Sequence, residues 1–130
     1  MTAPKRRIGD HASGPTTFVA PSTRIVGKIF GEGPYVFCGT VEGECDIDGT
    51  VTLAAGGRWQ GSLRGTDVIV AGVVDGNVVA RRKVEISPTG RVLGSLEGDS
   101  VAIARGAVIE GEVKVRSGRE PTRFEEKRKG

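Results

Sequence analysis

The 130-residue sequence has few aromatic side chains, 5% of the chain in all, with one tryptophan and one tyrosine among them. It has one histidine and two cysteines, but it contains 21 glycines. Glycine is unfavourable inside helices and common at tight bends, so this composition argues against a helical bundle or an ordinary globular core. A chain of this length predicts a single domain.

Long apolar runs are also lacking. No stretch approaches the roughly 20 consecutive apolar residues that a membrane-spanning helix requires. The first ten residues contain no apolar run, so we expect no signal peptide. Without export, Cys38 and Cys45 should be reduced thiols and not a disulfide. We therefore expect a cytoplasmic protein.

The charge balance is uneven along the chain, although the net charge is only +3. Residues 1–23 carry three basic and one acidic side chain, and residues 116–130 carry six basic and three acidic. Residues 24–115 carry ten basic and twelve acidic side chains. A faintly acidic body is therefore flanked by two basic segments.

What the sequence does contain is one short unit repeated six times. Its central glycines are Gly27, Gly43, Gly61, Gly76, Gly94 and Gly111. The clearest copies read GTVEGEC, GRWQGSL, GVVDGNV and GRVLGSL. The gaps between the glycines are 16, 18, 15, 18 and 17 residues, a mean of about 17. A short repeat at a fixed period is typical of a solenoid.

Within each unit apolar residues alternate with polar ones, which predicts strand. Apolar residues fall two positions before and two after the central glycine, as at Val74 and Val78, and a second strand of the form apolar-x-apolar follows. Turn-forming residues separate these pieces, so each unit should be one coil of a parallel β-helix of about six coils. Trp59 is bulkier than its equivalents and should lie among small neighbours or face outward.

Both flanks read as disordered because they are rich in Pro, Ser, Thr and charge. The predicted organisation is a disordered N-terminal tail at 1–22, a β-helix domain at 23–115 and a disordered basic C-terminal tail at 116–130.

No catalytic or metal-binding constellation is evident. Left-handed β-helix acyltransferases need a histidine on a coil, whereas the one histidine, His11, lies in the N-terminal tail. The two cysteines have no nearby ligands to complete a zinc site. Acidic residues 42, 44, 46 and 48 should line one outer face, which favours a solubilising surface over a weak calcium site. No phosphate-binding glycine motif occurs, so we expect neither a cofactor nor an enzyme.

The repeat body resembles the bactofilins, a family of bacterial cytoskeletal proteins, over about residues 22–115. The likeness rests on the serial G-x-[V/I]-x-G-x-[V/I] units and on runs such as DIDGTV, VIVAGVVDGNV and KVEISPTGRVLGSL. The resemblance implies a right-handed all-β fold with a triangular cross-section, and polymers that form without nucleotide. It further implies scaffolding of cell-wall, cell-shape or polarity proteins, with a peripheral location at the inner membrane in many members.

Polymer formation also follows from the repeat itself. A solenoid has two open ends that expose backbone hydrogen-bonding groups and apolar core, and neither flank supplies an obvious cap. We expect the end coils to form a homopolymer interface through Ile25, Val26, Ile29, Phe30, Val108, Ile109, Val113 and Val115.

The N-terminal segment offers a candidate membrane contact at Lys5, Arg6, Arg7 and Ile8. This segment lacks the bulky apolar start that the resemblance implies. Nucleic-acid binding is not expected, because the body is acidic and the tails carry no recognised fold. The alternatives are a monomeric β-helical module that binds lipid or a partner, and a divergent β-helix acyltransferase.

Overall fold

A computed structural model describes residues 16–116 and 122–124 of the chain. Every regular element among them is a β-strand, and every strand pair is parallel. The strands are β1 (Thr17–Val19), β2 (Arg24–Glu32), β3 (Tyr35–Phe37), β4 (Thr40–Asp48), β5 (Thr50–Leu53), β6 (Arg58–Val70), β7 (Val73–Ile86), β8 (Arg91–Gly98), β9 (Ser100–Ala104), β10 (Val108–Val115) and β11 (Thr122–Phe124).

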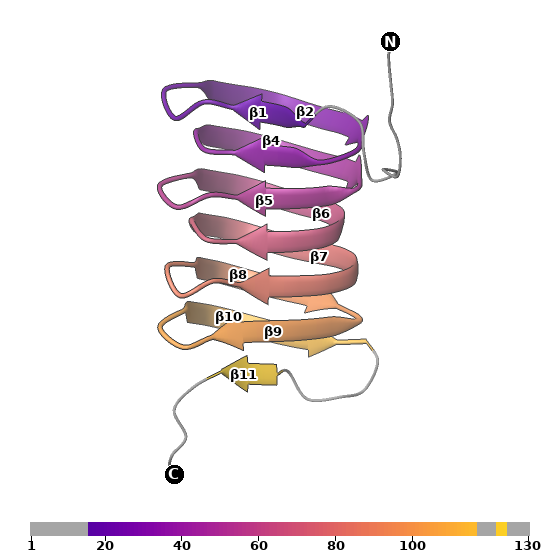
Figure 1. Cartoon of the computed structure of the whole chain (residues 1–130), viewed down its shortest axis with the longest axis vertical. Coiled ribbons are helices and arrows are strands. Elements are labelled where there is room, and N and C mark those ends of the chain that lie inside the picture. The colour runs from indigo at the N-terminus through magenta and orange to yellow at the C-terminus, as the bar shows by residue number, and fades with distance from the viewer. Residues whose placement is uncertain (1–15, 117–121, 125–130) are drawn as a thin grey trace.

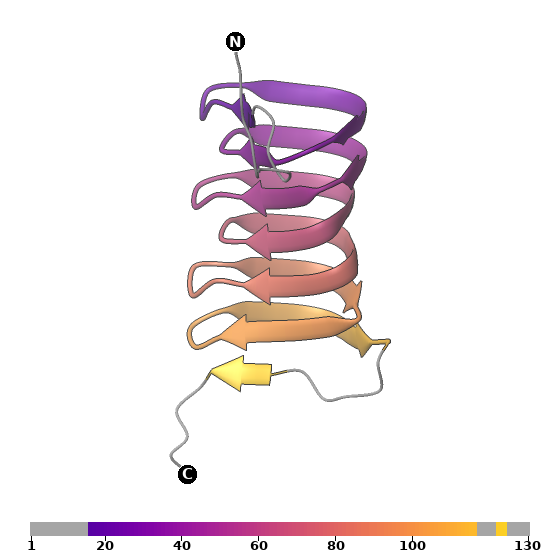
Figure 2. The same ribbon diagram turned by 45° about the vertical axis from the view of Figure 1, so that its right-hand side comes forward.

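The chain winds down one axis as a stack of coils (Figures 1 and 2). Each coil has three sides, giving the triangular cross-section. The first side precedes the central glycine, the second side follows it, and the third side is the short strand that completes the coil. The expected right-handed parallel β-helix of about six coils is confirmed.

The central glycine is the corner between the first and second sides. All six of these glycines have positive φ, from 126° at Gly61 to 148° at Gly76 and Gly111. Side chains other than glycine rarely adopt this conformation. The six glycines are stacked in register, with Gly43 beside Gly61 and Gly61 beside Gly76, so the corner repeats along the whole body.

The coils vary in length because their turns differ. After β5 and after the third side of β7 the chain makes a longer turn, closed by a hydrogen bond from the Gly57 amide to the Ala54 carbonyl and from the Gly90 amide to the Ser87 carbonyl. After β3 and β6, two residues suffice, Cys38 with Gly39 and Ala71 with Gly72. The unequal gaps in the sequence are therefore changes in the turns and at one corner, where the register between β6 and β7 shifts by one residue between Gly65 and Asp67.

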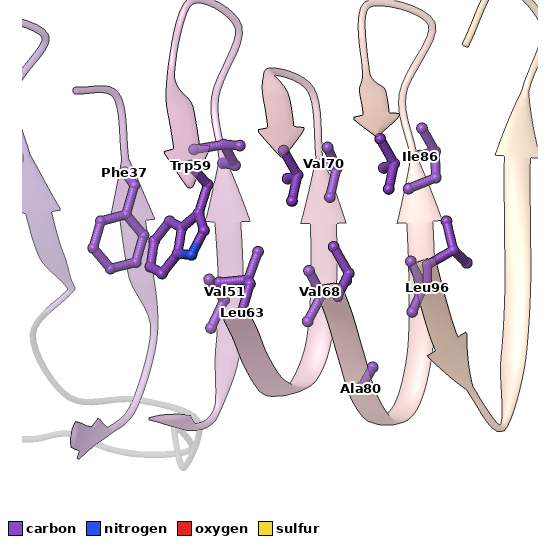
Figure 3. Close-up of a cluster of buried hydrophobic side chains, with 14 of the residues drawn as sticks. Phe37, Val51, Trp59, Leu63, Val68, Val70, Ala80, Ile86 and Leu96 are labelled. Atoms are coloured by element: carbon purple, nitrogen blue, oxygen red, sulfur yellow. The ribbon is translucent and has the colours of Figure 1, made fainter. Parts of the chain in front are cut away.

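The core is a continuous apolar column inside the coils (Figure 3). Twenty hydrophobic residues are buried and, among the described residues, no polar or charged residue is. Trp59 is 1% exposed and meets the ring of Phe37 edge-on, with 4.9 Å between ring centroids. Its indole Nε1 donates to the carbonyl of Ser62 at 3.2 Å. The suggestion that Trp59 might face outward is wrong, because its column neighbours Val41 and Val74 leave it room inside.

The structure differs from the expected tail boundaries at both ends. Thr17–Val19, within the segment predicted to be disordered, pair with Tyr35–Phe37 as strand β1. Thr122–Phe124, within the other, pair with Ala102–Ala104 as strand β11. The physical reason is that the third side of a terminal coil offers a free row of backbone hydrogen-bonding groups, which a short extended segment can occupy.

Candidate assembly surfaces

The first coil leaves one edge of the helix open. Strand β2 pairs with β4 on one side only, and no other described strand covers its outer edge. Ile25 and Ile29 are therefore half-buried, whereas their equivalents in the next coil, Val41 and Cys45, are 0% and 2% exposed. Core positions at this end thus lack the neighbour that every internal coil has.

The last full coil is open in the same way. Strand β10 pairs only with β8 among the described strands. Ile109, Val113 and Val115 occupy core positions and are half-buried, while Val92 and Leu96, one coil earlier, are 0% and 1% exposed. Strand β1 and strand β11 extend only the third side, so no strand of residues 16–116 and 122–124 covers the first or second side at either end.

The other predicted interface residues have a different orientation. Val26 and Phe30 lie on the outward faces of the first coil, where they are 69% and 72% exposed. Val108 is half-buried at the start of β10. These three side chains border the open ends and do not form part of the core columns.

The three sides of the lateral surface differ in their charged residues. The first side carries one charged residue in each coil, and the sign alternates down the stack. These residues are Arg24, Glu42, Arg58, Asp75, Arg91 and Glu110. Arg24 contacts Glu42 at 2.8 Å, which raises the pKa of the arginine through their hydrogen bond and charge attraction. Two ion pairs of this series therefore join neighbouring coils, Arg24 with Glu42 and Arg91 with Glu110 at 4.0 Å.

The second side has two arginines that connect coils two apart. Arg81 reaches past the third coil to Asp46 at 3.0 Å and Asp48 at 3.7 Å. Arg116, 35 residues later, contacts Glu97 at 3.1 Å and donates to the Ala80 carbonyl at 2.6 Å. The sequence analysis missed this pair, although the 35-residue spacing, two coils, was a visible signal.

The third side carries little charge from β1 to β9. Its charged strand residues are Asp67, Lys83 and Glu85. Lys83 contacts Glu85 at 3.3 Å, and Asp67 contacts Arg82 at 3.6 Å. The remaining outward positions hold small or uncharged side chains. The sequence analysis used these strands only for their inward residues and did not consider the uncharged residues between them.

The candidate acidic face is not a single face. The corner at Gly43 separates Glu42, on the first side, from Asp46 and Asp48, on the second. Three of these carboxylates are engaged with arginines from other coils, as described above. No cluster of three or more potential metal ligands occurs within residues 16–116 and 122–124.

Both cysteines are free thiols. Cys45 is buried in the core, where desolvation raises its pKa to about 12, and its thiol donates a hydrogen bond to the Arg64 carbonyl at 3.6 Å. Cys38 is half-buried beside the third side. The remaining candidates lie outside the described residues. They are His11 and the predicted membrane contact at Lys5, Arg6, Arg7 and Ile8. Within the part that is described, no helix long and apolar enough to span a membrane occurs.

Comparison with known proteins adds an independent observation. The bactofilin family model, described as polymer-forming cytoskeletal, matches residues 17–114. Bactofilin BacO of Myxococcus xanthus is 33% identical over 97 residues, which are 75% of this chain and 77% of BacO. Bactofilin BacP of the same organism is 31% identical over 97 residues, and the match spans only 40% of its length.

The fold has a match among solved structures. A cryo-EM reconstruction of Thermus thermophilus bactofilin double helical filaments superposes with a TM-score of 0.68 at 24% identity. The superposition covers 75% of this chain and 98% of the Thermus chain. At this identity it supports the fold. The family match, over most of the coiled body, shows that the chain belongs to the bactofilins, which are polymer-forming cytoskeletal proteins.

Proposed function

We propose that this protein is the subunit of a filament that assembles end to end, through its terminal coils, without nucleotide. The observation that carries the proposal is the half-burial of core columns at both ends, at Ile25 and Ile29 and at Ile109 and Val113. The same columns are fully covered inside the body. A second subunit placed on the open end would complete both the apolar column and the backbone pairing.

Apolar burial suffices to drive such a contact. Burying one aliphatic side chain fully contributes about 1.5–3 kcal/mol relative to full exposure, and the terminal residues are already partly covered. Several of them buried together, with a row of new backbone hydrogen bonds, form a contact that needs no chemical energy source. The sequence contains no phosphate-binding glycine motif that would couple assembly to a nucleotide.

The test is Ile109→Arg, which places a charge in the open core column of β10. We expect purified wild-type protein, without nucleotide, to form filaments in negative-stain micrographs and to sediment at high speed. The variant should stay in the supernatant while its circular dichroism remains that of a β-rich fold. Glu110→Arg is the matched control, because the neighbouring side chain points outward and is exposed; it should still assemble. Filaments of normal length from Ile109→Arg would overturn the proposed interface.

The Thermus relative forms double helical filaments, and we extend paired filaments to this chain. We further place the polymer in the role of a scaffold for cell-shape, cell-wall or polarity proteins, with the basic cluster of residues 5–7 as its contact with membrane lipid. Co-sedimentation with anionic vesicles tests the last point, since a variant with all three residues changed to glutamate should lose vesicle binding and keep its filaments. Pelleting of wild-type protein only when vesicles are present would instead favour a monomeric lipid-binding module.

A further inference from the structure

The third side of the coil stack has one strand more than the other two sides. Among the described residues, the first and second sides are formed by six strands, β2, β4, β6, β7, β8 and β10. The third side is formed by seven segments: β1, β3, β5, the ends of β6 and β7, β9 and β11. The surplus strand is β1 (Figure 1), because β11 completes the coil that β10 begins, whereas β1 precedes the first side of the first coil.

The two ends of the body therefore differ in shape. At the C-terminal end, β10 and β11 together form the three sides of one coil, so this end is flush. At the N-terminal end, β1 lies one strand spacing beyond the coil of β2 and β3, about 4.8 Å, so this end is stepped on its third side. A flush end placed against the step cannot pair with β1 and β2 at the same time.

The step interferes with every contact that uses the N-terminal end. If two N-terminal ends meet through their β1 strands, the two β2 strands remain three strand spacings apart, roughly 14 Å. If an N-terminal end meets a C-terminal end through β1 and β11, then β2 and β10 remain two spacings apart, roughly 10 Å. Backbone pairing needs a single spacing, so the half-buried Ile25 and Ile29 would stay uncovered in both arrangements. Two C-terminal ends, in contrast, meet without a gap.

We propose that β1 is a removable cap, which must leave the third side before the N-terminal end can join another subunit, while C-terminal ends join with every strand in place. This inference rests on the end-to-end filament proposed above. Once β1 has left, the body consists of six complete coils and both ends are flush, so every end-to-end contact fits. Release of β11 instead would leave both ends stepped and would fit only the contact between an N-terminal and a C-terminal end.

The contacts that hold β1 are few and can be replaced. The strand is three residues long and pairs with β3 alone. Beyond that pairing, the amide of Cys38 donates to the carbonyl of Val19 at 2.8 Å. Val19 is 8% exposed, whereas Phe18 is 60% exposed. A third-side strand of an incoming subunit would take the same place beside β3 and remake the backbone hydrogen bonds. The joined ends would in addition cover the open core column of β2, which β1 leaves uncovered.

A disulfide that holds β1 on β3 tests the cap. Phe18 and Val36 are register partners, and neighbouring strands lie about 4.8 Å apart, within the Cα separation that a disulfide spans. Phe18→Cys with Val36→Cys, in a Cys38→Ser background that removes the nearby thiol, should form no filaments after oxidation and should form them after reduction. Thr52→Cys with Ile69→Cys, in the same background, joins the internal strands β5 and β6 and should form filaments in both states.

The oxidised protein should stop at pairs joined by their C-terminal ends. Sedimentation velocity should show dimers at a concentration at which the reduced protein forms filaments, and monomers once Ile109→Arg is added. Filaments from the oxidised protein, or none from the reduced variant when the wild type assembles, would overturn the cap. Oxidised monomers without Ile109→Arg would overturn the free joining of C-terminal ends. An absence of filaments from wild-type protein would instead refute the end-to-end function.

Weakening the attachment of β1 gives a second readout, in which assembly should improve. Val19→Asp introduces a charge at the buried position of β1, and Phe18→Asp introduces the same charge at its exposed position. Apparent affinity rises with the fraction of subunits that are competent to bind, so Val19→Asp should lower the critical concentration for filaments. Phe18→Asp should leave that concentration at the wild-type value. An unchanged or raised critical concentration in Val19→Asp would overturn the inference, because β1 would then be either no obstacle or part of the contact.

Discussion

Replacing Gly76 with alanine tests how closely the coils are stacked at their glycine corners. Gly76 lies at the corner of β7 with φ of 148°. A Cβ atom added there would lie 2.1 Å from the carbonyl oxygen of Gly61 in the preceding coil. Ordinary carbon–oxygen contacts are longer than 3.0 Å. Because the obstacle is backbone, the substitution can be accommodated only if one coil moves relative to the next.

Gly27 provides the matched control, because it is the same corner in the first coil. Its φ is 134°, and a Cβ atom there would meet nothing within 4 Å. Both substitutions force alanine into a conformation that costs about 1–3 kcal/mol. Only Gly76→Ala adds an overpacking penalty, which is typically another 1–3 kcal/mol. We therefore expect the free energy of unfolding to fall by about 1–3 kcal/mol more in Gly76→Ala than in Gly27→Ala.

The chain carries its own probe for this measurement. Trp59 is the only tryptophan and is 1% exposed, so its fluorescence should move to longer wavelength on unfolding. Urea titrations of both variants in the Ile109→Arg background would keep assembly from contributing to the stability. An equal loss in free energy of unfolding for the two variants would refute the reasoning. It would show that the close approach of successive corners does not restrict the residue at Gly76.

Two further predictions concern the core. Trp59→Ala should lower the free energy of unfolding by about 3–5 kcal/mol, measured by circular dichroism in urea, because it removes the largest buried side chain and its contact with Phe37; a loss below about 1 kcal/mol would contradict the tight packing seen here. A thiol reagent at about pH 8 should modify Cys38 and leave Cys45 intact until the protein unfolds, since the thiolate is the reactive form. Burial raises the pKa of Cys45 from 9.0 to about 12, so its neutral thiol supports the fold below about pH 9 and that support is lost as the pH rises toward 12; reaction of both thiols in the folded protein would refute this.

The three sides of the helix differ in the charged residues that they expose. The ladder of alternating charge on the first side and the arginine contacts of Arg81 and Arg116 on the second connect coils within one subunit. These exposed ion pairs contribute little to stability, because water and salt screen the charges. Their larger consequence is that both sides are charged and hydrated.

The repeat in the sequence by itself determined the fold. Glycines such as Gly61 and Gly94, with apolar residues two positions away on either side, specified strand and inward face for every coil, because a period-two pattern allows one register. That these glycines are themselves corners, with positive φ, was decided by the structure. The repeat also identified Ile109 and Val113 as core residues of a terminal coil, since the apolar pattern continues to the last unit. These features are local and need no knowledge of which coils are neighbours.

Only the tertiary structure decided which residues of one coil lie next to which residues of another. The segments Thr17–Val19 and Thr122–Phe124 are too short for their apolar pattern to predict a strand. They form strands because each pairs with the open third side of a terminal coil. The position of Trp59 beside Phe37, and the reach of Arg81 across a whole coil to Asp46, depend on turns of unequal length that set which residues stack. The third side became visible as one sparsely charged surface only after winding placed residues about 17 apart in the chain next to each other.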